Sequence, residues 1–483
     1  MIKYQFSVYQ ADDSRKWSQF LCAFSATILA FVCGITFGWS SPVSAELKSD
    51  NHTSYDFPVN EGELSWIGSS LTLSAAFTCV PSGYLIYWIG RKWSLLLLTL
   101  PLLTGWALIL FAKTALMIIL GRIVLGIAVG GTFVIAPVYI GEIAQSEIRG
   151  TLGTMFQLLV TIGILFVYTL GAFVDVIRLT FICFVTPIVF AAVFVWMPES
   201  PTYLVNRGKL EEAEKSFGFL RGWKHDNHSE IERLKYEEEQ RQLVNQNQSL
   251  KVSFSRIEAR KALMIIIGLY VFHQLCGINA VIFNATDIFK KAKTDISPEV
   301  QTIGIGLIQV LMTLLSVFVA DKWGRKVLLF LSQILMAVTT LFMGIYFFIQ
   351  QNNEVMAESL LWLPMTSLGL FIVGYGIGQG PLVHTMIGEI CAPDIKGFAI
   401  GVAMSLNWFL AFCITKFFSD LQTTLGIHST FWIFSGFSFL GAAFVCVCVP
   451  ETKGKSLNAI QRMLAGVKEP QSDDVEQETE KNT

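Results

Sequence analysis

Charged residues are scarce in this chain. Asp, Glu, Lys and Arg make up 15% of its 483 residues, whereas hydrophobic residues make up 53%. A soluble domain carries about 25% charged residues, so the composition excludes an ordinary soluble globular protein. The formal net charge is only −2, which gives no electrostatic reason to expect a nucleic-acid partner. The composition predicts a polytopic, all-α membrane protein.

Motifs for metal binding, disulfides and catalysis are also missing. The nine cysteines lie in or beside apolar segments without metal-ligand spacing, which argues against a disulfide framework and against a zinc site. We interpret them as small buried hydrophobic residues. The sequence has no phosphate-binding loop and no recognisable nucleophile–base pairing. We therefore expect neither an enzyme nor a cofactor or metal.

The two ends of the chain lack long apolar runs. The first nineteen residues contain both acids and bases and no apolar core of a cleavable signal, so the first span is expected to act as an uncleaved anchor. The acidic, polar tail beyond Lys468 is expected to be disordered.

What the chain has instead is twelve apolar runs, each long enough for the roughly 20 residues that cross a bilayer about 30 Å thick. They lie at 20–44, 65–88, 94–112, 116–140, 152–174 and 178–197, and at 262–288, 300–320, 327–349, 359–388, 398–419 and 429–449. Between the two sets, charged and spaced apolar residues predict short helices. The expected units are an N-terminal segment 1–19, six-helix bundles at 20–199 and 261–449, linker helices at 200–260 and a tail at 450–483.

Basic residues predict the orientation of these spans. An even number of spans puts both termini on one side, and most Lys and Arg residues fall in loops on that side, including the cluster between Arg207 and Lys261. The positive-inside rule therefore predicts cytoplasmic termini. The glycosylation sequon at Asn51 then lies outside, whereas those at Asn227 and Asn247 lie in the cytoplasm and are discounted.

Three charged motifs occur twice in the same order. Gly90-Arg91-Lys92 returns as Gly324-Arg325-Lys326, Gly141-Glu142-Ile143 as Gly388-Glu389-Ile390, and Pro198-Glu199-Ser200 as Pro450-Glu451-Thr452. This repeat predicts two six-helix halves related by an axis along the membrane normal, the plan of the major facilitator superfamily. Five glycines are expected to allow close helix approach within the first half: Gly83, Gly121, Gly126, Gly130 and Gly131.

The seventh span is unusually polar. His273, Gln274, Asn279 and Asn284 interrupt its apolar run, and Gly277 lies among them. Polar side chains in a span tend to face a bundle interior or a wet cavity. Gln274 and Asn279 are five residues apart, so they share a face only if the backbone loosens near Gly277. The alternative is that these groups simply join neighbouring helices by hydrogen bonds.

With these motifs in hand, nearly the whole chain resembles the sugar-porter family of the major facilitators. The resemblance is carried by Pro137 to Glu142, Arg149-Gly150 with Gln157 downstream, Pro198 to Pro201, Gln274 to Asn279, Asp321 to Lys326 and Pro450 to Lys455. Gly38 to Pro42, and Asn407-Trp408 followed by Thr415-Lys416, more narrowly resemble insect facilitated trehalose transporters and facilitative glucose transporters.

The resemblance implies a central cavity that binds a neutral sugar. Its contacts would be Gln157, Gln274, Asn279, Gln309, Asn407 and Trp408. Amides both donate to and accept from hydroxyl groups, and an indole stacks on the C–H face of a sugar. The chain departs from the family pattern at His273 and His384, which either line the cavity, with pH sensitivity as a consequence, or are neutral histidines hydrogen-bonded to a neighbouring helix. Tyr87 and Thr202 also replace usual family residues, an acid or amide and an Arg, respectively.

The resemblance also implies gating and coupling. Charged clusters would hold the halves together when the cavity faces outward and break when it opens inward. Their members would be Arg91, Glu142, Arg149, Glu199, Asp321, Arg325, Glu389, Lys396 and Glu451. Proton-driven relatives carry an Asp where this chain has Ser40, which predicts a uniporter for trehalose or a hexose such as glucose. The alternatives are a proton symporter with His273 or His384 as carrier and, from a different class, a non-transporting sugar sensor. We expect a functional monomer in the plasma membrane.

Overall fold

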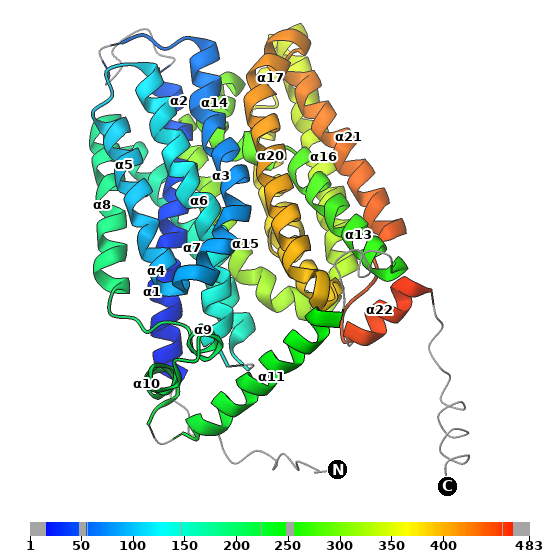
Figure 1. Ribbon diagram of the computed structural model, residues 1–483. Coiled ribbons are helices and arrows are strands. Elements are labelled where there is room, and N and C mark those ends of the chain that lie inside the picture. Colours follow the sequence, from blue (N-terminus) through cyan, green and yellow to red (C-terminus); the bar gives the residue numbers. More distant parts are fainter. Residues whose placement is uncertain are drawn as a thin grey trace.

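The computed structural model describes residues 16–47, 55, 57–145, 147–223, 225–247, 256–455 and 457–466. Within these residues the regular structure is helical throughout (Figure 1). The helices form an elongated bundle of two halves. A shorter group of helices lies across one end.

The first half, called the N half below, holds six spans. Two of them are broken into consecutive helices, at Trp39 in the first span and at Leu98 in the third. Pro101 lies near the start of the second piece of the third span, where a missing N–H does no harm. The helices are α1 (Lys16–Gly38), α2 (Ser40–Leu47), α3 (Glu61–Ile89), α4 (Arg91–Leu97), α5 (Thr99–Leu110), α6 (Ala115–Ile143), α7 (Arg149–Gly171) and α8 (Val176–Phe194).

Three polar helices follow: α9 (Pro201–Asn206), α10 (Leu210–Arg221) and α11 (Asn227–Asn247). They enclose a small apolar core of their own, with Leu204, Val205, Ala213, Phe217 and Ile231 buried. The Gln19 side chain of α1 donates hydrogen bonds to Gln145 Oε1, which follows α6, and to the Leu220 carbonyl of α10. The second of these bonds attaches α10 to the N half.

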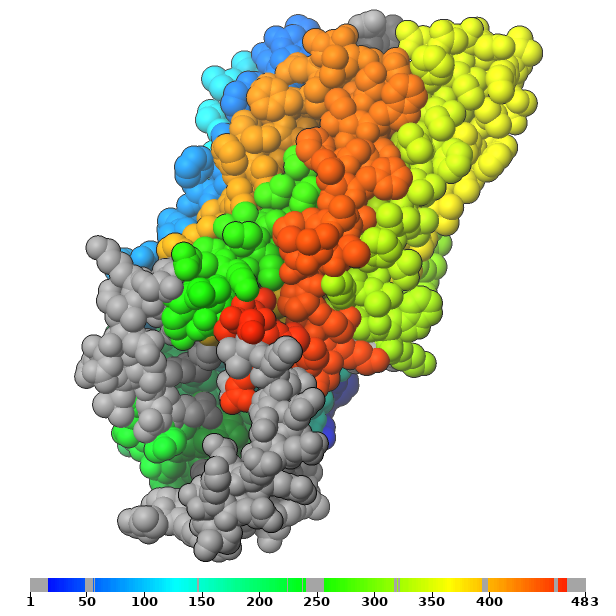
Figure 2. All heavy atoms as spheres, turned by 90° about the vertical axis from the view of Figure 1, so that its right-hand side faces the viewer, coloured from blue at the N-terminus to red at the C-terminus, as the bar shows by residue number. Residues whose placement is uncertain are grey.

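The second half, called the C half, repeats the six spans and adds a terminal helix. Its helices are α13 (Ile257–Leu275), α14 (Ile278–Ala292), α15 (Pro298–Trp323), α16 (Arg325–Asn352), α17 (Glu354–Glu358), α18 (Leu363–Gly374), the π-helix η1 (Tyr375–Gln379), α19 (Gly380–Ile390), α20 (Pro393–Leu425), α21 (Ile427–Cys448) and α22 (Leu457–Ala465). Figure 2 shows α21 beside α16 and α13, with α22 below them.

Eleven of the described helices or helix pairs are long and apolar enough to cross a membrane. The sequence predicts twelve spans, and the difference is α3, which covers the expected run at 65–88. At 29 residues α3 is long enough, but it begins with Glu61 and Glu63 and is rich in Ser, Thr and Gly, so its hydropathy is low. It nevertheless packs against α6 and α20.

Close packing of neighbouring helices on α6 explains most of the glycines expected in the first half. A Cβ atom on Gly126 would lie 2.2 Å from the Leu71 carbonyl oxygen, and one on Gly130 would lie 2.5 Å from that of Ala75. Gly121 is held equally close to α5, with 2.8 Å from its ideal Cβ to the Gly105 oxygen. Gly83 differs, because nothing lies within 4 Å of its ideal Cβ. The close-approach prediction is wrong for Gly83.

We call the end of the bundle that carries α9–α11 the lower end and the opposite one the upper end, as they lie in Figure 1. The two halves are hydrogen-bonded together toward the upper end. Ser41 Oγ of α2 lies 2.9 Å from Thr286 Oγ1 of α14 and accepts from its backbone N–H at 3.0 Å. Tyr168 of α7 donates to the Ile282 carbonyl at 2.6 Å. These hydrogen bonds join α2 and α7 of the N half to α14 of the C half at this end.

Candidate functional site

The seventh span is broken where its polar residues gather. Gly277 separates α13 from α14 with a φ of +86°, a left-handed conformation that favours glycine, and a Cβ there would lie 2.6 Å from the Phe434 ring. The break changes the angular spacing of the flanking residues. Asn279 Nδ2 consequently donates to Gln274 Oε1 at 2.7 Å, although the two residues would not share a face of a regular helix.

A third amide extends this pair. Gln274 Nε2 donates to Asn407 Oδ1 of α20 at 2.7 Å. We call Asn279, Gln274 and Asn407 the amide chain. Gln274 and Asn407 are buried and Asn279 is partly exposed, so one end of the chain is accessible. Amides at its two ends retain donors and acceptors for further hydrogen bonds.

Both predicted histidines lie next to each other in the C half. His273 Nε2 is 3.2 Å from the Tyr375 hydroxyl of η1, and His384 Nδ1 of α19 is 2.7 Å from the Tyr270 hydroxyl of α13. The two imidazole centroids are 6.0 Å apart. Each histidine is thus hydrogen-bonded to a neighbouring helix, while His273 Nδ1 remains buried without a partner.

The two remaining glutamines come from α7 and α15, which pack together across the halves. Gln309 is buried and its Oε1 has no hydrogen-bond partner, whereas Gln157 is partly exposed. The described hydrogen bonds do not join either side chain to the amide chain. Leaving a buried acceptor without a hydrogen bond costs about 1–3 kcal/mol of free energy. Gln309 Oε1 is therefore available to accept a hydrogen bond from a ligand or a water molecule.

Trp408 lies where the halves meet. Its ring centroid is 5.7 Å from that of Phe37 in α1 and 5.1 Å from that of Phe133 in α6, both in the N half. Phe37 also stacks on Phe283 of α14 at 6.0 Å. The indole is therefore buried against phenylalanines of the N half in this conformation. Its Nε1 is buried without a partner and remains a potential donor.

The duplicated charges form two clusters of the same design at the lower end. Arg91 Nη2 lies 2.7 Å from Glu142 Oε1, and Glu142 also accepts from the Ser200 hydroxyl. Glu199 accepts from the backbone N–H groups of Arg91 and Lys92 at 2.9 and 3.0 Å, at the start of α4. A carboxylate in this position satisfies helix N–H groups and complements the helix dipole.

The C half repeats each contact. Arg325 Nε lies 3.1 Å from Glu389 Oε1, Thr452 donates to Glu389, and Glu451 accepts from the N–H groups of Arg325 and Lys326 at 3.0 and 3.1 Å. The described ion pair of each cluster joins two residues of the same half, the N half for Arg91–Glu142 and the C half for Arg325–Glu389. They do not join the two halves in this conformation.

The carboxyl groups of Glu199 and Glu451, which accept hydrogen bonds at the starts of α4 and α16, have pKa values shifted in opposite directions. Burial raises the pKa of Glu199, and hydrogen bonds from the backbone only partly offset it. Burial acts on Glu451 in the same direction, but four backbone N–H groups, those of Lys453, Arg325, Lys326 and Thr452, outweigh it and lower the pKa of that carboxyl.

Three predicted residues are described only in part or not at all. The side chains of Asp321 and Lys396 and the whole of Asn51 fall outside the described residues. Arg149 starts α7 and donates to the Ala144 carbonyl at 3.4 Å. Their roles in gating and glycosylation therefore stay predictions.

Comparison with known proteins places this arrangement in a family. The family profile described as Sugar (and other) transporter matches residues 26–464. The chain is 35% identical over 450 residues to "Facilitated trehalose transporter Tret1-2 homolog" of Drosophila simulans, covering 93% of this chain and 91% of that protein. It is 33% identical over 462 residues to "Facilitated trehalose transporter Tret1" of Apis mellifera ligustica, covering 96% and 91%. The chain belongs to the sugar transporter family.

This sugar transporter also shares its fold with a solved structure. The inward-open xylose transporter XylE from E. coli superposes with a TM-score of 0.74 at 22% identity, covering 91% of this chain and 99% of that one. The all-helical major-facilitator fold and the multi-pass membrane character predicted from the sequence are confirmed.

Sequence reasoning missed one buried cation of the sugar transporter. Arg122 of α6 is fully buried in the N half, where its Nε, Nη1 and Nη2 donate to the Ile67 carbonyl, the Thr36 carbonyl and Ser40 Oγ at 3.1, 2.6 and 2.7 Å. A lone Arg inside the apolar run 116–140 was the available signal. The aromatic partners of the histidines, Tyr270 and Tyr375, carried no such signal.

Proposed function

We propose that this protein is a facilitative transporter that moves a neutral sugar, trehalose or a hexose such as glucose, across the membrane. The observation that carries the proposal is the amide chain Asn279–Gln274–Asn407 within a membrane-embedded bundle. Sugar hydroxyls both donate and accept, and neutral amides match them without a charge that a neutral cargo would leave unpaired. The names of the relatives favour trehalose within this class.

The amide chain is joined by groups that have unused hydrogen-bonding capacity. Gln309 Oε1, Trp408 Nε1 and His273 Nδ1 are buried without partners. Buried polar groups are usually paired, so these three unpaired atoms favour a site that a polar cargo completes. Gln157 and His384 are proposed as further contacts, from the N half and from α19.

The absence of an ionisable acid beside Arg122 supports uniport. Ser40 occupies the position at which proton-driven relatives carry Asp, and its hydroxyl accepts from Arg122 Nη2. In the described part of the chain Arg122 makes no ion pair with a carboxylate. A hydroxyl does not titrate in the physiological range, so this site carries no proton with the sugar.

Alternating access accounts for the two clusters at the lower end. We propose that the lower end is cytoplasmic, with both termini on that side, and that the present conformation is closed to the outside. In it, the Arg91–Glu142 and Arg325–Glu389 pairs stay within their halves. When the cavity faces outward, the halves approach at the lower end, and these charges, with Arg149, Asp321 and Lys396, form a conditional network across the halves.

The remaining assignments follow from this orientation. The protein is proposed to act as a monomer in the plasma membrane, with Asn51 on the outer face as a glycan acceptor. The domain limits expected from the sequence, six-helix bundles at 20–199 and 261–449 joined by linker helices at 200–260, are proposed as the functional units.

Uptake of a radiolabelled panel tests the proposal. Purified protein in liposomes should take up trehalose or a hexose and exclude charged solutes such as gluconate. The Gln274→Ala variant, incorporated to the same level, should lose most of that uptake. Binding of a sugar without any flux would favour the sensor instead, and uptake unaffected by Gln274→Ala would remove the amide chain from the site.

A further inference from the structure

Lys416 is a charged residue in a membrane-spanning helix that the transport site does not use. It lies on α20 near the upper end and is only partly exposed. Its Nζ lies 3.2 Å from Ser65 Oγ of α3, and the same ammonium stands 4.6 Å from the centroid of the Trp66 ring. Among the described residues it makes no ion pair with a carboxylate. Its partners are a hydroxyl and an indole, and both belong to the other half.

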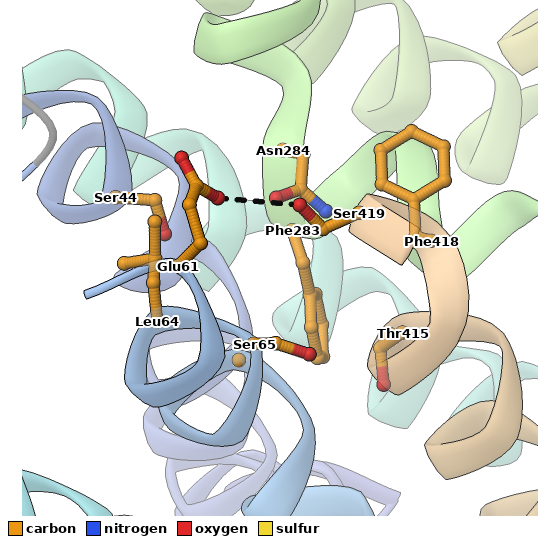
Figure 3. Close-up of a pocket in the computed structure, with 10 residues that line it drawn as sticks. Ser44, Glu61, Leu64, Ser65, Phe283, Asn284, Thr415, Phe418 and Ser419 are labelled. Carbon is orange, nitrogen blue, oxygen red and sulfur yellow. Dashed lines mark hydrogen bonds between the residues drawn. The ribbon is translucent and has the colours of Figure 1, made fainter. Parts of the chain in front are cut away.

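Neighbouring contacts join the same two helices. Ser65 Oγ donates to the Lys416 carbonyl at 2.6 Å, and the Trp66 and Phe412 rings lie 5.9 Å apart. One turn closer to the upper end, Ser419 donates to Glu61 Oε2 at 3.3 Å, the contact drawn in Figure 3. The pocket in Figure 3 lies between these helices and is lined from both halves, by Ser44 and Glu61 on one side and by Asn284 and Thr415 on the other.

These contacts can exist only while the upper ends of α3 and α20 touch. An ammonium over an indole is attracted by the ring quadrupole, and this attraction strengthens where water is excluded. If α3 and α20 separate, Lys416 loses the Trp66 face and the Ser65 hydroxyl together, and the pocket opens to water.

We propose that Lys416 is the latch of the outer mouth: its contact with Trp66 and Ser65 stabilises the outward-closed conformation and sets how often the transporter opens to the outside. The inference rests on the alternating-access transport proposed above. Lys416 is a positioning residue in this scheme and touches no sugar. Removing it shifts the equilibrium toward the outward-open state, about three- to tenfold for a single cation–π contact of this kind.

The test measures opening directly, without sugar flux. Ser44→Cys places a thiol in the pocket of Figure 3, where the native serine is buried. Labelling of intact cells with a membrane-impermeant methanethiosulfonate reagent reports opening, after subtraction of labelling in the protein without that substitution. Adding Lys416→Met, which keeps an unbranched side chain without the charge, should raise the labelling rate about three- to tenfold. Lys416→Arg should restore slow labelling.

A matched control comes from the same end of the molecule. Lys291 of α14 donates to Gln422 and pairs with Asp287, and all three belong to the C half. Lys291→Met removes an equivalent charge without breaking a contact between the halves, so labelling should not change. If Lys416→Met fails to reach the surface, Trp66→Leu removes the latch from the other half and should give the same acceleration. Unchanged labelling in the surface-expressed latch variant, or equal acceleration by Lys291→Met, would overturn the proposal.

These readouts separate the latch from the transport proposal. Faster labelling in Lys416→Met combined with an absence of sugar flux in the wild type supports the latch and contradicts the proposed function. Normal flux in the wild type combined with unchanged labelling in Lys416→Met supports the proposed function and contradicts the latch.

Discussion

Ser40 Oγ accepts a hydrogen bond from Arg122 Nη2 at 2.7 Å inside the N half. Both residues are fully buried. The guanidinium also donates to the Thr36 and Ile67 carbonyls and lies 5.5 Å from the centroid of the Trp39 ring. A buried cation with only neutral partners is unusual, because a carboxylate would normally compensate it. In the proposed uniport mechanism, the hydroxyl at position 40 gives this site no acid that could exchange a proton.

A carboxylate at position 40 should therefore make transport sensitive to protons. In Ser40→Asp the new carboxylate lies beside Arg122 and forms an ion pair whose protonation differs between conformations. We expect an inward proton gradient to change sugar uptake into liposomes by a factor of at least about three. A factor of three corresponds to a smaller free energy than a shift of one pKa unit. Ser40→Asn, which adds a similar volume without an ionisable group, is the control, and its uptake should ignore the gradient.

The amide chain should be required for flux. In Gln274→Ala, Asn279 and Asn407 both lose their partner, and a buried group left unpaired costs about 1–3 kcal/mol. Uptake at low sugar concentration should fall about tenfold or more at equal protein level. Gln333 provides the control, because this buried glutamine lies against Gly441 of α21, away from the amide chain. Equal losses in Gln274→Ala and Gln333→Ala would show a general packing defect instead.

Packing of α3 on α6 should depend on Gly126 and not on Gly83. A side chain at Gly126 meets the Leu71 backbone oxygen, which cannot move aside as a flexible side chain does. Gly126→Val should therefore abolish or strongly reduce monodisperse protein in detergent. Gly83→Val fills open space and should leave yield and apparent melting temperature nearly unchanged, apart from the helix-propensity difference of a few tenths of a kcal/mol.

The two capping carboxyls should respond differently to pH. The folded-state pKa of Glu451 is lowered, so its ionised form stabilises the fold above the unfolded pKa of about 4.3, and this contribution is lost as the pH falls through the native value. The pKa of Glu199 is raised, so its ionisation is disfavoured in the folded state as the pH rises.

Thermal unfolding in detergent checks this difference. At pH 7 Glu451→Gln should lower the apparent melting temperature more than Glu199→Gln does. The difference in apparent melting temperature between the two variants should become smaller as the pH is lowered to about 4 and below. A larger loss in Glu199→Gln at pH 7 would reverse the assignment.

The sequence predicted the bundle well because its signals are local. Apolar runs, basic loops and three repeated charged motifs are legible without any tertiary contact, and the Glu142 and Glu389 pairs occur at the positions that the repeat indicated. The sequence also predicted the span at 65–88 that α3 forms, although this helix is rich in Ser and Thr. Such residues are tolerated in a span that packs against neighbouring helices.

The candidate site was predictable only in part. The polar seventh span identified Gln274 and Asn279, but their meeting depends on the left-handed turn at Gly277, which a sequence pattern does not fix. The pairing of His273 and His384 with tyrosines of other helices, and the phenylalanines against Trp408, follow from long-range packing. No local periodicity reports such contacts.

The concentration of sugar reached inside liposomes tests the central claim, downhill transport of a neutral sugar, most directly. Radiolabelled trehalose and glucose would be followed to steady state in liposomes that contain the wild-type protein, with and without an inward proton gradient. The account predicts that at least one of them enters faster than into empty liposomes and that its internal concentration stops at the external one under both conditions. Accumulation above the external concentration when the gradient is imposed would contradict it.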